Sequence, residues 1–179
     1  MSTIFWCHFI WKQLLGIVVV QLLWAAQGAS DTRPGKRIVC SAGAVYPLQL
    51  IVIIQSVESL IPGVYRYSSS SHTLSLIKEG LFNHSLQEAA LDQSFVSQAP
   101  AVVLFAADYT DICQKYKQRG INYTFIEVGH AAQNLALQAV SLGLGSVDVG
   151  AFHDDDVKNL LGLNPGEHPV LLVPIGTAQ

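Results

Sequence analysis

The sequence has few of the features that would assign it to several common classes of protein. Only 13% of its 179 residues are charged, the formal net charge is −3, and the chain contains no basic block. Nucleic-acid binding is therefore not expected, because it depends on a clustered positive face. The three cysteines are scattered, without the close spacing of a zinc site or of a disulfide framework. We predict that the protein has no metal site and no disulfide scaffold.

Long apolar runs are also missing. The longest covers Leu14 to Ala26, whereas a membrane-spanning helix needs about 20 apolar residues. Such a run fits either a buried helix or the core of a signal peptide that ends near residue 29. The pattern alone does not separate these two interpretations. In the second, the protein is a secreted or membrane-tethered domain, and Cys40 and Cys113 would remain and could pair.

Half of the residues are apolar, which is enough for the core of one domain. Periodicity and turn residues predict a first strand, a hairpin with serines at its tip, and then alternating helices and strands. The hairpin requires antiparallel pairing, so the fold is α+β or α/β with a mixed sheet. The expected strands are 48–57, 64–67, 73–80, 100–108, 146–152 and 168–176, and the expected helices are 84–93, 111–120, 122–145 and 153–163.

Two glycine-containing junctions are candidate ligand loops. Ser41, Ala42 and Gly43 are small enough to let a planar ligand approach the backbone. In the second junction, the backbone N–H groups of Gly150 and Ala151 could face an electron-rich edge of a ligand. Taken as isolated motifs, both are explained at least as well by ordinary structure, a tight loop and a helix end followed by a β-bulge.

Two polar clusters resemble metal sites but favour structural roles. Glu127, His130 and Asn134 share one helix face, yet no third ligand has suitable spacing, so we expect a buried polar network. The run from His153 to Asp156 is best explained as acidic residues in the first turn of a helix.

Several of these segments, in their order along the chain, resemble the flavin-dependent nitroreductase family. Within it, they are most similar to the SagB-type dehydrogenases, the branch that includes azoline oxidases. The resemblance runs from about Leu22 to Gly176 and includes CSAGAVYPLQLIVI, PGVYRY, QKYKQRGINYTFIEVGHAAQN, GLGSVDVGAF and PVLLVPIG. It implies an α+β, three-layer fold in which helices flank a mixed, mostly antiparallel sheet.

The resemblance also implies a function. Members are homodimers with FMN at the interface, and hydride passes through flavin N5 to or from a nitroaromatic, a quinone or an azoline ring. NAD(P)H is a candidate electron donor. Ser41, Ala42 and Gly43 match the loop along the FMN, and Val149, Gly150 and Ala151 match the turn whose N–H groups meet the N5/O4 edge. Lys115 and Tyr116 match a pair proposed as acid–base residues in the azoline-oxidising branch.

One family feature is missing at the N-terminus. Members open with an arginine-rich segment that holds the FMN phosphate, and MSTIFWCHFIWK stands in its place. We therefore expect an atypical segment at 1–13 and one domain at 14–179. A truncated relative that binds flavin weakly and acts as a partner subunit is an alternative to the enzyme. Because QLLWAAQG matches the helix before the flavin loop, we favour a helix of the domain over a signal peptide. We therefore expect a cytoplasmic protein that does not contact a membrane.

Overall fold

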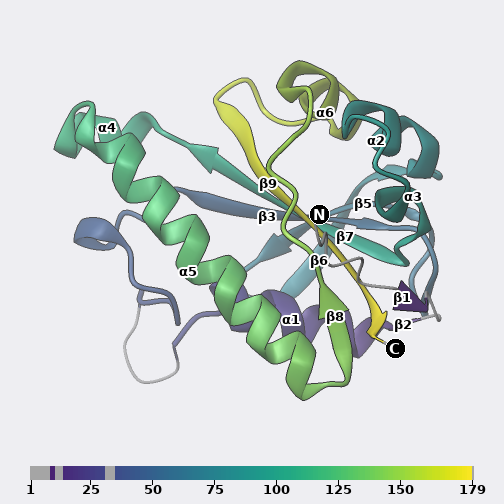
Figure 1. Cartoon of the computed structure of the whole chain (residues 1–179). Helices are drawn as coiled ribbons and strands as arrows, with labels where there is room; N and C mark the ends of the chain where they lie inside the picture. Colours follow the sequence, from purple (N-terminus) through teal and green to yellow (C-terminus); the bar gives the residue numbers. More distant parts are fainter. Residues whose placement is uncertain (1–8, 11–13, 31–34, 179) are drawn as a thin grey trace, which may run out of the picture.

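The structure is a computed structural model that describes residues 9–10, 14–30 and 35–178 (Figure 1). Most of the expected atypical segment, residues 1–8 and 11–13, lies outside the described residues. The strands are β1 (Phe9–Ile10), β2 (Leu14–Leu15), β3 (Leu48–Ile54), β4 (Val57–Glu58), β5 (Gly63–Ser68), β6 (Thr73–Glu79), β7 (Ala101–Asp108), β8 (Leu144–Ser146) and β9 (Glu167–Ala178). The helices are α1 (Gly16–Gln27), the 3₁₀ turn η1 (Ala42–Ala44), α2 (Asn83–Ala89), α3 (Ser94–Gln98), α4 (Thr110–Tyr116), α5 (Arg119–Ser141) and α6 (Asp154–Leu161).

A seven-stranded antiparallel sheet forms the centre of the fold. Its order is β1-β9-β7-β3-β5-β6, with β8 also paired to β9, and a separate parallel pair joins β2 to β4. The central strands β3 and β7 are apolar at nearly every position because both of their faces are buried. The predicted α+β fold with a mostly antiparallel sheet is confirmed.

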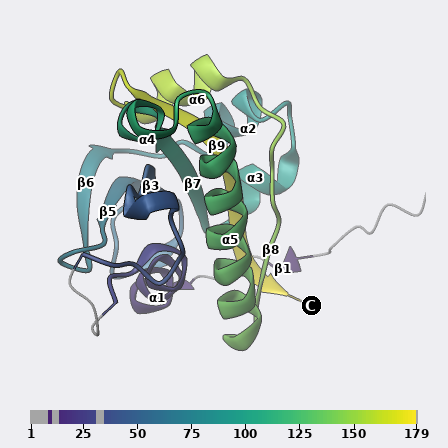
Figure 2. The same ribbon diagram turned by 90° about the vertical axis from the view of Figure 1, so that its left-hand side faces the viewer.

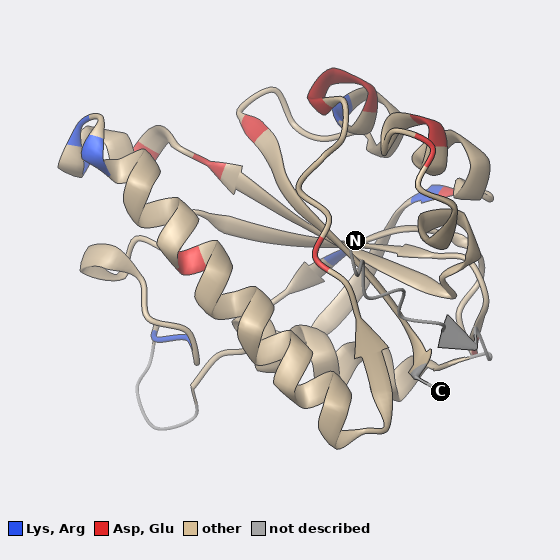
Figure 3. Cartoon of the chain, in the orientation of Figure 1, with Lys and Arg blue, Asp and Glu red and all other residues tan. Residues whose placement is uncertain are grey.

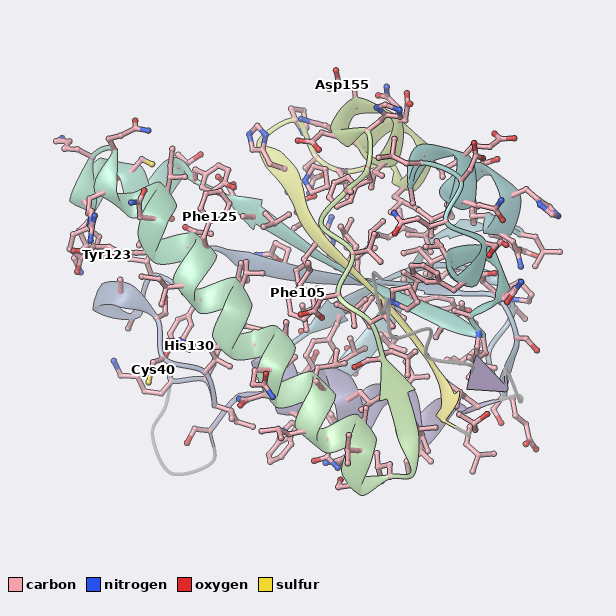
Figure 4. All side chains as sticks on the ribbon, in the orientation of Figure 1. Cys40, Phe105, Tyr123, Phe125, His130 and Asp155 are labelled. Carbon is pink, nitrogen blue, oxygen red and sulfur yellow. The ribbon has the colours of Figure 1, made fainter. Side chains whose placement is uncertain are left out.

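Helices cover both faces of the sheet and make three layers (Figures 1 and 2). Helices α1 and α5 pack over the face that carries Leu50, Val52 and Phe105. Helices α2, α3 and α6 pack over the opposite face, which carries Ile51 and Leu104. Figure 4 labels Phe105 beside α5, near the middle of the sheet, where it is fully buried in the core cluster that includes residues of α5. The two clusters are separated by the sheet itself.

The apolar run that opens at Leu14 forms a helix of the domain. Within α1, Leu22, Leu23 and Ala26 are fully buried and belong to the core cluster that includes residues of α5. The helix ends at Gln27, with Gly28 as its C-cap, so the helix predicted in this run is present in the structure. In the described part of the chain, no helix is long and apolar enough to cross a membrane.

Some element boundaries differ from those predicted. The strand expected at 146–152 is instead β8, which ends at Ser146, followed by a single bridge between Val149 and Leu172. Gly120 was expected to end a helix, but it lies inside α5, against the backbone of Ile112. A glycine here allows α4 and α5 to approach closely, which sequence alone cannot distinguish from a helix stop.

Three further details of the helices were predicted wrongly. Helix α5 ends before Gly143, which has a φ of 71°, rather than at Gly145. Helix α2 covers Asn83–Ala89, whereas the expected helix continued to residue 93. Helix α3 was not predicted, since its five residues are too few to show a helical period.

The ion pair between Arg66 and Glu167 joins β5 to β9 across the end of the sheet and generates a test of the fold. The guanidinium donates two hydrogen bonds to the carboxylate, at 2.6 and 2.9 Å. Burial alone would raise the pKa of Glu167, but hydrogen bonds from Arg66 and the Asn164 N–H outweigh it and hold that pKa below its ordinary value. The pair therefore stabilises the fold above pH 4.5, and this stability is lost as the pH falls through the lowered pKa.

We predict that Glu167→Gln lowers the free energy of unfolding at pH 7 by about 1–3 kcal/mol, because Arg66 loses its charged partner. The difference from wild type should shrink as the pH falls from 4.5 to the lowered pKa, because Glu167 is protonated first in the unfolded chain and only at lower pH in the native state. Urea unfolding from pH 3 to 7 measures this, with Glu88→Gln on exposed α2 as the control. A constant difference over the whole pH range would contradict the assignment.

Candidate functional site

The loop from Arg37 to Tyr46, called here the 37–46 loop, leads from α1 into β3 and is held in one shape by its own side chains. The Tyr46 N–H donates to the Ser41 hydroxyl at 2.8 Å, and the Arg37 N–H donates to the Tyr46 hydroxyl at 3.0 Å. The Arg37 guanidinium also lies over the Tyr46 ring, 4.9 Å from its centroid. These contacts order the loop without the help of a ligand.

Gly43 brings the loop against the end of α4. Its φ of 58° lies in the left-handed region that favours glycine, and a Cβ there would collide with the ends of the Lys115 and Tyr116 side chains. The Lys115 ammonium donates to the Gly43 carbonyl at 3.2 Å. Tyr116 in turn meets the edge of Tyr123, with ring centroids 5.2 Å apart. The structure thus brings together three of the site residues predicted from the sequence.

A buried carboxylate anchors the loop from below. Glu127 of α5 is only 2% exposed and accepts a hydrogen bond from the Gln27 amide at 3.3 Å, while Gln27 accepts one from Arg37 at 2.7 Å. Burial raises the pKa of Glu127, and hydrogen bonds from Ser41 and Gln27 offset this only in part. The predicted buried polar network is confirmed for Glu127, whereas His130 is exposed on α5. Gln27 and Arg37 were not predicted as members, because they are distant in sequence from Glu127.

A cavity of about 660 Å³ opens beside the loop. This volume is in the range of small-molecule binding sites. Its walls combine small residues with two cationic side chains, Lys36 and Arg37, which suits a ligand that carries an anionic group. The described residues that line it are Ser30, Lys36, Arg37, Val39, Cys40, Ser41, Gly43, Ala44 and Tyr46.

The other predicted ligand segment lies on the opposite face of the sheet. Val149 is buried in the core cluster of α2, α3 and α6, and the Ala151 carbonyl accepts a hydrogen bond from Gln93 at 3.0 Å. Gly150 is exposed, with open space where a side chain would be. The 660 Å³ cavity includes none of these three residues. Within one chain, Val149–Ala151 and the 37–46 loop therefore do not form one site.

The acidic run before α6 also has a structural explanation. His153 is the N-cap of α6. The first turn contains Asp154, Asp155 and Asp156, and the helix dipole stabilises carboxylates at this position. Figure 3 shows the red of these residues gathered on α6, far from the blue of α4. Among the described residues, no group of three or more His, Cys, Asp or Glu is placed to hold a metal ion.

Sequence comparison identifies the family. The sequence model of the nitroreductase family matches residues 18–177. The chain belongs to the nitroreductase family. It is 43% identical over 155 residues to a Methanocaldococcus jannaschii protein that carries the name nitroreductase, an alignment covering 87% of this chain and 77% of the relative.

Solved structures share the fold. A nitroreductase-named protein of Anabaena variabilis superposes with a TM-score of 0.84 at 23% identity, over 96% of this chain but only 35% of that longer one. One from Ralstonia eutropha gives 0.80 at 26% identity, over 96% of this chain and 77% of that one. The Escherichia coli microcin synthetase complex gives 0.83 at 22% identity, over 94% and 65%. These likenesses support the nitroreductase fold.

We predict that Gly43→Ala disturbs the site more than it disturbs the fold. Its left-handed φ costs alanine about 1 kcal/mol of stability, and the new methyl group also pushes Lys115 and Tyr116 away from the loop. The matched control is Gly162→Ala, which has a φ of 67° and open space around the new Cβ. The two variants should have similar melting temperatures in thermal unfolding, whereas only Gly43→Ala should bind a ligand in this cavity more weakly than wild type. Equal binding by both variants would contradict this geometry.

The raised pKa of Glu127 predicts a pH-dependent stability. Between pH 4.5 and the raised value, the native state holds a proton that the unfolded chain has released, so stability falls as the pH rises through this window. The stability of Glu127→Gln should not fall in this window, because glutamine does not titrate. The free energy of unfolding of the variant, relative to that of wild type, should therefore rise across the window by about 1.4 kcal/mol for each unit of pKa difference. Urea unfolding from pH 4 to 8 measures the gain. If wild type and variant stay parallel, Glu127 is not the group responsible.

Proposed function

We propose that this nitroreductase-family protein is an FMN-dependent oxidoreductase, most similar to the SagB-type branch. The observation that carries the proposal is the contact of Lys115 and Tyr116 with the Gly43 loop. It places an ammonium and a phenolic hydroxyl beside a small-residue loop whose cavity suits a planar ligand. FMN would supply hydride transfer at N5, and Lys115 and Tyr116 would hold or move the accompanying proton.

The proposed site is completed by a second copy of the chain. Ser41, Ala42 and Gly43 would lie along the flavin ring, and the N–H groups of Val149, Gly150 and Ala151 would meet its N5/O4 edge. One chain carries these two segments on opposite faces of its sheet. A symmetric dimer can bring the loop of one subunit to the turn of its partner.

The exposed surface of α5 supports such a dimer. Phe125, Ile126, Leu137 and Val140 are 52–71% exposed along this helix, although they are large and apolar. Beside them, an apolar groove of about 470 Å³ runs between α1 and α5. An exposed apolar surface of this kind is typical of a subunit interface.

The proposed cofactor, electron donor and substrate follow from the relatives. The NADPH:FMN oxidoreductase of Vibrio harveyi, solved with NAD⁺, superposes with a TM-score of 0.67 at 16% identity, which favours FMN with NAD(P)H as electron donor. The microcin synthetase complex was solved with truncated pro-MccB17 bound. We propose a nitroaromatic, a quinone or an azoline ring in a peptide as the substrate.

Two further parts of the proposal, the domain boundaries and the location, rest on the sequence. Residues 14–179 act as one domain after an atypical segment at 1–13, and the protein works in the cytoplasm. The alternative function is that of a partner subunit with weak or no flavin binding. The segment 1–13, which does not resemble the arginine-rich segment of the family, favours this alternative. The hydrogen bonds within the 37–46 loop favour the enzyme.

A flavin titration separates the two. We predict that one FMN binds per chain, as measured by flavin fluorescence. We also predict that the bound flavin, once reduced, passes electrons to a quinone. Lys115→Ala with Tyr116→Phe should keep the flavin but slow azoline oxidation, because both proposed proton carriers are removed. Failure to bind FMN would favour the partner-subunit alternative.

The dimer has its own test. We predict that Leu137→Lys converts the dimer to a monomer and weakens FMN binding together with it, because a charge enters the centre of the apolar surface. Leu81→Lys is the control, since Leu81 is 68% exposed but lies away from α5. Light scattering and flavin fluorescence measure both effects. A monomeric Leu137→Lys that binds FMN normally would refute the shared site.

A further inference from the structure

Helices α4 and α5 meet at a basic surface made by residues 115–119, called here the 115–119 corner. Lys115, Lys117 and Arg119 are exposed there, and they are three of the ten lysines and arginines of a chain whose net charge is −3. Figure 3 shows their blue at this end of the molecule. Among the residues that the structure describes, the only ion pair joins Arg66 to Glu167. The cations of the corner are therefore not paired with a carboxylate of the described chain.

Lys117 has a backbone conformation that lysine rarely adopts. Its φ is 52° and its ψ is −144°, at the residue that follows α4. Glycine adopts such a conformation without strain, whereas a residue with a Cβ is strained in it. The Lys117 ammonium donates to the Gln114 carbonyl at 3.4 Å, which is long for a hydrogen bond. Stability alone would favour glycine at this position, so the positive side chain indicates a use outside the fold.

Arg119 lies against an aromatic ring. Its guanidinium is 5.5 Å from the centroid of the Tyr123 ring, one turn further along α5. Within the described part of the chain, no acceptor forms a hydrogen bond with this guanidinium. A stacked guanidinium presents its N–H groups at its edge, where arginine binds a carboxylate through two hydrogen bonds. Arg119 is therefore suited to bind a carboxylate from outside the chain.

The corner holds these groups in fixed positions. A Cβ on Gly120 would lie 2.7 Å from the Ile112 carbonyl oxygen, so α4 and α5 are in close contact. The rings of Tyr116 and Tyr123 meet edge to face, with centroids 5.2 Å apart, and connect the two helices a second time. Groups that are already ordered lose less entropy when a partner binds.

The shape and chemistry of the corner fit a polypeptide. It protrudes at the outer end of α4 and α5 (Figure 1), and the 660 Å³ cavity includes none of its residues. Small molecules usually bind in concave sites, whereas arginine and tyrosine are enriched where proteins bind one another. Nucleic acid fits less well, because its binding depends on a larger basic surface. We propose that the 115–119 corner docks an acidic polypeptide segment.

The position of the corner connects the docked segment with the reaction. Lys115 and Tyr116, the proposed proton carriers, contact Gly43 from this same corner. Carboxylates bound at Lys117 and Arg119 would hold the neighbouring residues of their own chain beside these two groups. The docked segment is thus the acidic flank of a peptide substrate that carries an azoline ring, and this part of the inference rests on the proposed function.

Fluorescence polarisation with a labelled hexaglutamate peptide tests the docking without flavin. At low salt, wild type should bind the peptide, and Lys117→Gln and Arg119→Gln should each weaken binding about fivefold, as expected for one exposed charge pair. Lys117→Gly should weaken binding as much but raise the melting temperature by about 2–4 °C, because it relieves the strained backbone. Weaker binding by a more stable variant cannot result from unfolding.

Two controls match these variants. Lys78→Gln removes an exposed cation on β6, and Ser59→Gly relieves a φ of 70° without removing a charge. Both should bind hexaglutamate as wild type does. The proposal is overturned if wild type does not bind, if the controls lose as much affinity as the corner variants, or if hexaserine or a six-nucleotide oligo(dT) binds as tightly.

Oxidation of two thiazoline peptides, with FMN and a quinone as electron acceptor, tests whether the docked segment belongs to the substrate. The peptides differ only in their flank, which is four glutamates or four serines. Wild type should have a lower KM for the acidic peptide, and Arg119→Gln should remove this difference while leaving the KM for the serine peptide unchanged. Equal KM values in wild type would refute the assignment to the substrate. Docking of hexaglutamate without oxidation of either peptide would keep the surface but refute the proposed function.

Discussion

The arrangement of the candidate site depends on one buried carboxylate. Removing the Glu127 charge from water is costly, and hydrogen bonds from Gln27 and Ser41 offset this cost only in part. Because Gln27 belongs to α1 and Ser41 to the 37–46 loop, helix α5 holds both in fixed positions. The loop in turn presents Gly43 to the end of α4. A buried charge thus determines where a surface loop meets its proposed proton carriers.

The sheet imposes a second constraint. Because β3, β7 and β9 are buried on both faces, the segments that flank them emerge on opposite sides, and the two predicted flavin segments are kept apart. Within the nitroreductase fold, this separation is consistent with a site shared by two chains. The proposed shared site would also account for the exposed apolar side chains along α5, the longest helix among the described residues.

The sequence predicted the strands and the long helix better than it predicted their boundaries. Gly43, Lys115 and Tyr116 were each predicted as site residues, but their contact was not predicted. The apolar runs of β3 and β7 are strong signals, because both faces are buried. Gly120 was misjudged, since a glycine needed for close helix packing resembles a helix stop. The separation of β3 from β5, and Arg37 held within it, depend on contacts between distant segments that no local pattern encodes.

The central claim is that each flavin site contains the loop of one chain and the turn of another. Mixing two inactive variants tests it most directly: Cys40→Trp, which blocks the loop cavity, and Gly150→Trp, which blocks the turn. After subunit exchange, a shared site should recover about a quarter of the FMN-binding sites, because each mixed dimer contains one intact loop–turn pair. A site formed within single chains would recover none, and that result would contradict the account.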